Sequence, residues 1–114
     1  MSTILYKTHE ERRLYAKKVC AYDGEREIGR AYVYVIYNDL HEAPYGLLED
    51  VFVNESYRGK NIGNTLLQHA ISAAKECGCY KLIGTSRLER IAVHEWYERL
   101  GFEKYGYEFR LNLK

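Results

Sequence analysis

Two glycines and two cations lie where an apolar run gives way to a helical pattern. The stretch ESYRGKNIG, residues 55–63, directly follows a V-F-V run. Gly59 and Gly63 permit backbone conformations that other residues avoid and allow close approach of a ligand. A helix that begins here exposes unpaired N–H groups and a partial positive charge. With Arg58 and Lys60 beside them, these groups predict a binding site for an anion.

The spacing separates this loop from two familiar phosphate-binding motifs. It is not a P-loop, because Lys60 precedes the last glycine, and it does not match G-x-G-x-x-G. The anion would then be held by successive backbone N–H groups rather than by one side chain. For the bare loop, a helix start with solvated cations is the alternative interpretation.

The elements that position this loop follow from the hydrophobic pattern. Strands are predicted over residues 14–22, 28–37, 45–54, 80–85 and 107–113, with a hairpin turn at Asp23-Gly24. Helical spacing predicts helices over 62–77 and 90–100, closed by Gly78 and Gly101, with Phe102 packing back on the second. Thr8 and Glu11 also fit a capping box for a short helix.

The predicted order is β-β-β-α-β-α-β. It indicates an α/β (α+β) fold with a mixed, mostly antiparallel central sheet flanked by helices, in a single domain over residues 1–114. Two carboxylates, Glu49 and Asp50, lie within the third strand. In a regular strand they point to opposite faces, and a β-bulge would change this.

Composition narrows the class of protein. The 114 residues are 46% hydrophobic with a net charge of +1, so no global field attracts nucleic acid or membrane. No apolar run approaches the roughly 18 residues of a membrane span. We therefore expect a cytoplasmic protein with reduced thiols at Cys20, Cys77 and Cys79 and no metal. A redox or metal protein built on the last two cysteines is an alternative.

Two longer stretches resemble a known family. LLEDVFVNESYRGKNIGNTLL is similar to the central motif of the GNAT superfamily of acyl-CoA-dependent N-acyltransferases, a V-x-V strand followed by [QR]-x-x-G-x-[GA] at a helix start. RIAVHEWYERLGFEKYGYEF is similar to the later signature, an aromatic-Tyr pair followed by L-G-F. The likeness covers residues 28–113.

The chain departs from the family pattern at two places. Asn61 replaces the middle glycine of the loop, and asparagine is among the residues that best tolerate a left-handed conformation. Only about a dozen residues precede the first strand, where family members usually have two helices. The resemblance therefore implies an acceptor site that is open or is completed by a second subunit of a homodimer.

The resemblance implies acetyl-CoA as donor and co-substrate, with no metal. Main-chain groups of Val51 and Val53 would pair with the pantetheine arm like an added strand. The pyrophosphate would be held by the loop residues Arg58, Gly59, Lys60, Asn61, Ile62, Gly63 and Asn64.

The same resemblance implies catalytic roles. Glu49 is the candidate base for the attacking amine, and Tyr97 the candidate acid for the departing thiolate. Asp50 would contact a cationic acceptor, and a strand N–H near Val51 would polarise the thioester carbonyl. For these residues the alternatives are a solvated carboxylate and a core tyrosine. We expect His94 to be exposed on its helix and Trp96 to serve in packing. The implied reaction acetylates a primary amine, either a small polyamine-like molecule or a protein amino group. The alternative function is a non-catalytic acyl-CoA-binding module.

Overall fold

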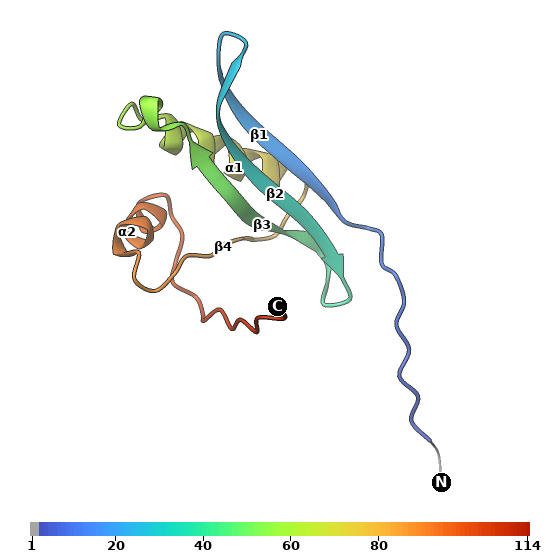
Figure 1. The fold of residues 1–114 in the computed structure, drawn as a ribbon. Helices are drawn as coiled ribbons and strands as arrows, with labels where there is room; N and C mark the ends of the chain where they lie inside the picture. The colour runs from blue at the N-terminus through green and yellow to red at the C-terminus, as the bar shows by residue number, and fades with distance from the viewer. Residues whose placement is uncertain (1–2) are drawn as a thin grey trace.

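A computed structural model describes residues 3–114 and contains one four-stranded sheet with two helices (Figure 1). The elements are β1 (Tyr15–Asp23), β2 (Arg26–Asn38), β3 (His41–Val53), the 3₁₀ turn η1 (Glu55–Tyr57), α1 (Ile62–Glu76), β4 (Leu82–Gly84) and α2 (Ile91–Arg99). The strand order is β1-β2-β3-β4, with antiparallel pairing among the first three strands and parallel pairing of β4 with β3. The predicted mixed, mostly antiparallel sheet is confirmed.

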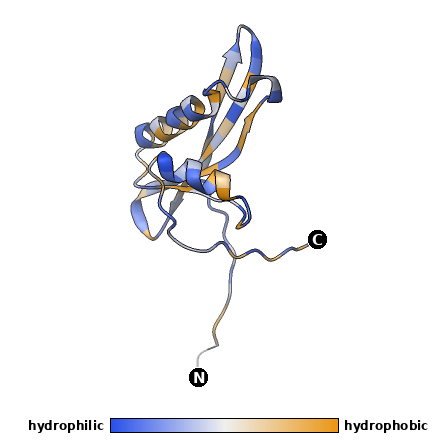
Figure 2. Cartoon of the chain, turned by 90° about the vertical axis from the view of Figure 1, so that its left-hand side faces the viewer, coloured by the Kyte–Doolittle hydropathy of each residue, from blue (hydrophilic) through white to orange (hydrophobic). Residues whose placement is uncertain are grey.

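The core lies between one face of the sheet and α1. Alternate residues of β2 point to this face, so Val33 and Val35 are fully buried while Tyr34 is exposed. Leu67 of α1 packs against them. Figure 2 shows α1 on one side of the strands. Tyr97, of α2, lies on this side too, beside Gly84 and Leu48. Within residues 3–114, no helix covers the opposite face, which is called the open face below.

Leu67 offers a direct test of this core. We expect Leu67→Ala to lower the free energy of unfolding by about 2–5 kcal/mol, because a side chain only 1% exposed leaves a cavity that its neighbours cannot fill. Urea denaturation followed by circular dichroism measures the loss. Leu40→Ala, at a site 78% exposed, is the matched control and is expected to change stability by less than about 0.5 kcal/mol. Equal losses in both variants would contradict this assignment of the core.

Both helices end as the sequence predicts. At the end of α2, Phe102 N–H donates to the Tyr97 carbonyl at 3.0 Å and Gly101 N–H donates to the Glu98 carbonyl at 3.1 Å. Gly101 has φ 102°, a left-handed conformation that glycine adopts without strain. The Phe102 and Tyr97 rings lie 5.2 Å apart, so this Schellman motif also fixes the tyrosine ring.

Two predicted elements are absent from the described residues. No helix forms before β1, because the Glu11 carboxylate accepts hydrogen bonds from Arg12 and Arg13 instead of closing a capping box. Apolar and polar residues alternate in the sequence of residues 107–113, but this segment forms no strand, and its apolar side chains, including Tyr107 and Phe109, are exposed. A strand needs a partner for its backbone groups, and this segment has none within the described chain.

Among residues 3–114, no helix combines the length and the apolar character needed to cross a bilayer.

Candidate functional site

The site begins where β3 and β4 part. Their parallel pairing ends at Leu48 opposite Gly84, whereas β3 continues to Val53. On its other edge, β3 stays paired with β2 as far as Val53. The backbone of residues 49–53 thus presents one unpaired edge, to which an extended ligand can add as a strand does.

A β-bulge interrupts β3 at this point. Tyr32 pairs with Glu49 and Arg30 pairs with Phe52, so Asp50 and Val51 together face one residue of β2. Asp50 has φ 51°, and both carboxylates are exposed. The alternative with a regular strand, in which Glu49 and Asp50 point to opposite faces, is therefore wrong, and the bulge alternative is confirmed.

Asp50 is held by an ion pair. Its carboxylate accepts hydrogen bonds from Arg30 Nε at 2.8 Å and Arg30 Nη2 at 3.0 Å, and this bidentate pair lowers the pKa of Asp50 below its usual value. Within the described chain, Glu49 has no such bond or ion pair. Of the two carboxylates, Glu49 is thus the one available to a ligand.

The loop between η1 and α1 leaves the start of α1 uncapped. Asn61 is the N-cap residue with φ 63°, and its side chain makes no capping hydrogen bond. The N–H groups of the first helical turn, residues 62–64, therefore have no partner within the helix. Gly59 has φ 80° with open space where a side chain would start. The tolerance of Asn61 for a left-handed conformation, predicted from the sequence, is confirmed.

These groups line one hollow of about 470 Å³, here called the loop hollow. Its lining is Val51, Val53, Tyr57, Arg58, Gly59, Asn61, Ile62, Gly63, Asn64, Arg90 and Trp96. All of the loop and strand residues proposed for the donor are present except Lys60, whose ammonium lies 5.4 Å from the centre of the Tyr57 ring. Arg58 Nε donates to the Val53 carbonyl at 3.2 Å, which ties the loop to the end of β3.

Three residues of this lining, Tyr57, Arg90 and Trp96, were not predicted as site residues from the sequence. Trp96, expected only in packing, donates its indole N–H to Asn64 Oδ1, and a Cβ added at Gly63 would lie 3.3 Å from its ring. The aromatic-Tyr pair was a signal for this position. Arg90 reaches the hollow from the residue before α2, and nothing in its spacing marks it.

Tyr97 lies where the strands part. A Cβ added at Gly84 would lie 3.2 Å from the tyrosine ring, so only glycine allows this approach without displacement. Burial raises the pKa of Tyr97, the negative charge of Glu49 raises it further, and Arg90 partly opposes both. The phenol is thus protonated at neutral pH and lies within electrostatic reach of Glu49.

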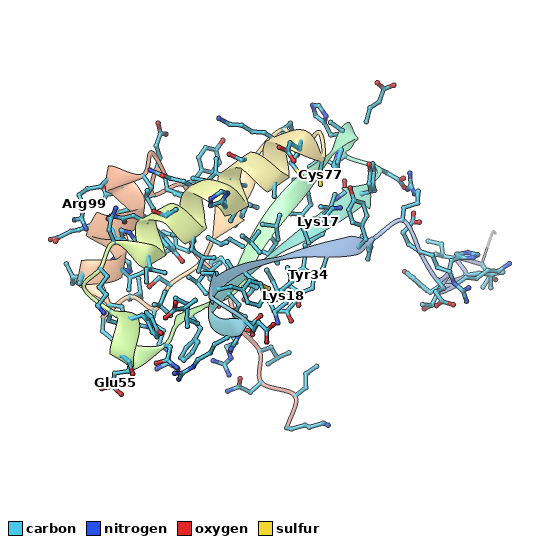
Figure 3. All side chains as sticks on the ribbon, turned by 90° about the horizontal axis from the view of Figure 1, so that it is seen from above. Lys17, Lys18, Tyr34, Glu55, Cys77 and Arg99 are labelled. Atoms are coloured by element: carbon cyan, nitrogen blue, oxygen red, sulfur yellow. The ribbon has the colours of Figure 1, made fainter. Side chains whose placement is uncertain are left out.

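A second hollow of about 680 Å³, here called the outer hollow, lies on the open face of the sheet. It is lined by Leu14, Tyr15, Ala16, Tyr34, Val35, Ile36, Leu47, Glu49 and Asp50. Figure 3 shows Tyr34 on the side of the sheet away from α1. Along β3, the last residue that lines the outer hollow is Asp50 and the first that lines the loop hollow is Val51, so the change from one lining to the other falls at the bulge.

Other predicted side chains lie outside this arrangement. His94 is half-buried rather than exposed, because its Nε2 lies 2.8 Å from the Arg87 carbonyl oxygen. Cys77 lies at the end of α1 farther from the loop (Figure 3), and both Cys77 and Cys79 are free, half-buried thiols. Burial raises the pKa of Cys79, which makes it less reactive. The residues that the structure describes contain no cluster of three metal-ligating side chains.

The sequence of this chain is similar to those of known acetyltransferases. The sequence model of the Acetyltransferase (GNAT) family matches residues 2–102. The chain is 32% identical over 89 residues to aminoglycoside N(6')-acetyltransferase type 1 of Stenotrophomonas maltophilia, a match covering 75% of this chain and 57% of the relative. It is 37% identical over 68 residues to glucosamine 6-phosphate N-acetyltransferase of Trypanosoma brucei brucei, covering 60% and 44%. The chain thus spans about half the length of these curated relatives.

A solved structure shares the fold. The putative acetyltransferase from Agrobacterium tumefaciens str. C58 superposes with a TM-score of 0.76 at 30% identity, over 82% of this chain and 65% of that one.

Proposed function

Because the chain belongs to the GNAT acetyltransferase family, we propose that it transfers the acetyl group of acetyl-CoA to a primary amine. The observation that carries this proposal is the uncapped start of α1, which opens into the loop hollow beside the unpaired edge of β3. A helix N-terminus binds phosphate groups, and a free strand edge binds an extended amide chain. Coenzyme A has both parts in one molecule.

The residues present fit this co-substrate. The N–H groups of the loop, residues 59–64, would hold the pyrophosphate, with Arg58 and Lys60 supplying positive charge. Val51 and Val53 would pair through their main chains with the pantetheine arm. We add Arg90 to this set, since it lines the same hollow.

The acetyl thioester supplies an activated carbonyl. Side chains of this protein would remove a proton from the acceptor and donate one to the departing sulfur. Glu49 takes a proton from the ammonium of the acceptor, directly or through water, so that the amine nitrogen can form the new C–N bond. A strand N–H near Val51 donates to the carbonyl oxygen as charge develops there. Tyr97 gives its proton to the sulfur as the C–S bond breaks, and the second proton lost from the amine nitrogen returns through water to the tyrosine oxygen.

The acceptor would approach through the outer hollow. Glu49 is the available carboxylate in its lining, and a cationic amine complements that charge. Asp50 lies in the same lining, but its charge is balanced by Arg30, so the predicted contact between Asp50 and a cationic acceptor would require this ion pair to open. The two curated relatives are named for amine-bearing acceptors, an aminoglycoside and glucosamine 6-phosphate. We propose an acceptor of this broad class, either a small polyamine-like molecule or a protein amino group.

Calorimetric titration with CoA tests the proposal. We expect one site per chain with a dissociation constant in the micromolar range, about −8 kcal/mol. Trp96 is the single tryptophan and lines the loop hollow, so its fluorescence should change over the same titration. No heat and no fluorescence change would refute the assignment of the donor. Release of CoA from acetyl-CoA with a library of amines then separates an enzyme from a non-catalytic acyl-CoA-binding module, because the module releases none.

A further inference from the structure

Asn61 does not do what an asparagine at a helix start usually does. Asparagine is a favoured N-cap residue because its side-chain oxygen accepts a hydrogen bond from the N–H of the second or third helical residue. Here no such bond forms, and Oδ1 instead accepts from Asn64 Nδ2 at 2.6 Å. Asn61 also has a left-handed backbone, with φ 63°, rather than the extended backbone that usually accompanies an N-cap hydrogen bond. Its side-chain oxygen, a possible acceptor for the free N–H groups, is thus bonded to another side chain.

Trp96 fixes which end of the Asn64 amide faces Asn61. An indole N–H is a donor only, so the atom that it meets on Asn64 must be the oxygen. The opposite end of the amide, Nδ2, is then left to donate to Asn61 Oδ1. A reversed amide would bring two acceptor oxygens together at that contact. The order of the three side chains, Trp96 to Asn64 to Asn61, is therefore determined by the indole.

Packing holds the first member of this series in place. Trp96 is half-buried, its ring lies against Gly63 in the first turn of α1, and its centroid is 5.8 Å from that of Tyr97. The indole thus bridges α2 and the start of α1. Because Asn64 lies in the first turn of α1 and Trp96 lies on α2, a fixed indole orients the Asn64 amide from outside its own helix.

We infer that Trp96 and Asn64 are positioning residues that hold the Asn61 side chain away from the start of α1. The N–H groups of residues 62–64 then remain available for a diphosphate. The inference rests on the proposed function for the identity of that anion. Without the indole donor, the Asn64 amide can rotate and the Asn61 oxygen can turn onto its own helix, where it competes with the ligand.

The experiment is calorimetric titration of the whole chain with CoA. Trp96→Phe keeps an aromatic ring and removes only the donor, and we expect its dissociation constant to rise about fivefold to tenfold, the scale of one N-cap interaction. Asn64→Ala removes the middle member, and we expect a rise of similar size. In turnover, the KM for acetyl-CoA should rise more than kcat falls.

Asn61→Gly provides the rescue. With no side chain at position 61, nothing can turn onto the helix, so Trp96→Phe in this background should bind CoA within about twofold of Asn61→Gly alone. A ring that served only packing would give the same loss in both backgrounds. Thermal unfolding of each variant confirms that the titrated protein is folded.

The outcomes separate this inference from the proposed function. If the unchanged protein binds CoA and Trp96→Phe binds it equally well, the positioning role is refuted and the proposed function stands. The same holds if the loss persists in the Asn61→Gly background. If the unchanged protein does not bind CoA, the proposed function fails and this inference fails with it.

Discussion

Tyr97→Phe is expected to lower kcat by about 10²–10⁴-fold, the usual contribution of a general acid, while the dissociation constant for CoA stays within about twofold. The phenol oxygen is the only group removed, and the ring keeps its contacts with Gly84 and Phe102. Steady-state kinetics with acetyl-CoA and a responsive amine measure the rate. Tyr105→Phe, at an exposed site, is the matched control and should match the unchanged protein.

The pH dependence gives this prediction a second readout. Burial and the charge of Glu49 raise the pKa of Tyr97, so the proton needed by the leaving thiolate is retained above the ordinary tyrosine value of about 10. Activity that depends on this phenol should therefore fall only at a pH above that value. Tyr97→Phe should lack this alkaline limb. An unchanged kcat would remove Tyr97 from the mechanism and leave it a core tyrosine.

Glu49→Gln is expected to lower kcat/KM at pH 7 by about 10²-fold or more, because a base within the site is lost. An amine with a pKa of about 10.4 is neutral in roughly one molecule per thousand or fewer at that pH. Without the base, the reaction depends on that neutral fraction. The rate of the variant should then rise about tenfold per pH unit between pH 7 and 9, whereas the unchanged protein should vary much less.

Glu42→Gln is the matched control for this change. Glu42 is an exposed carboxylate on the same strand, β3, and lies outside both hollows, so its loss should leave the rate and the pH profile as they are. Binding of CoA should persist in both variants. Parallel pH profiles for Glu49→Gln and the unchanged protein would show that the carboxylate takes no proton from the acceptor.

The predictable parts of the fold were those whose causes are local. The glycine after each helix, the Asp23-Gly24 turn and the spacing of α1 each depend on a few neighbouring residues, and all were correct. The segment 107–113 failed because alternation states which side chains share a face but not which backbone will pair with them. The Glu11 prediction failed because the neighbouring arginines offered a nearer partner.

In the candidate site, too, the features with local causes were predictable and those that depend on distant parts of the chain were not. The loop residues adjoin in the sequence, and all but Lys60 line one hollow. The position of Asp50 depends on a bulge, which is set by the register between two strands and leaves no mark in a single sequence. Trp96 and Asn64 are 32 positions apart, and only the packing of α2 against the start of α1 brings them together. Sequence spacing alone carries no information about such a pair.

The bulge at Asp50 and Val51 also separates two sets of residues on β3. Leu47, Glu49 and Asp50 line the outer hollow, whereas Val51 and Val53 line the loop hollow. Under the proposed function, mutations on the two sides have separate consequences: those before the bulge alter which amine is accepted, and those after it alter donor use. Related proteins with this strand can therefore change their acceptor through substitutions before the bulge, while the residues after it, which would bind the donor, stay the same.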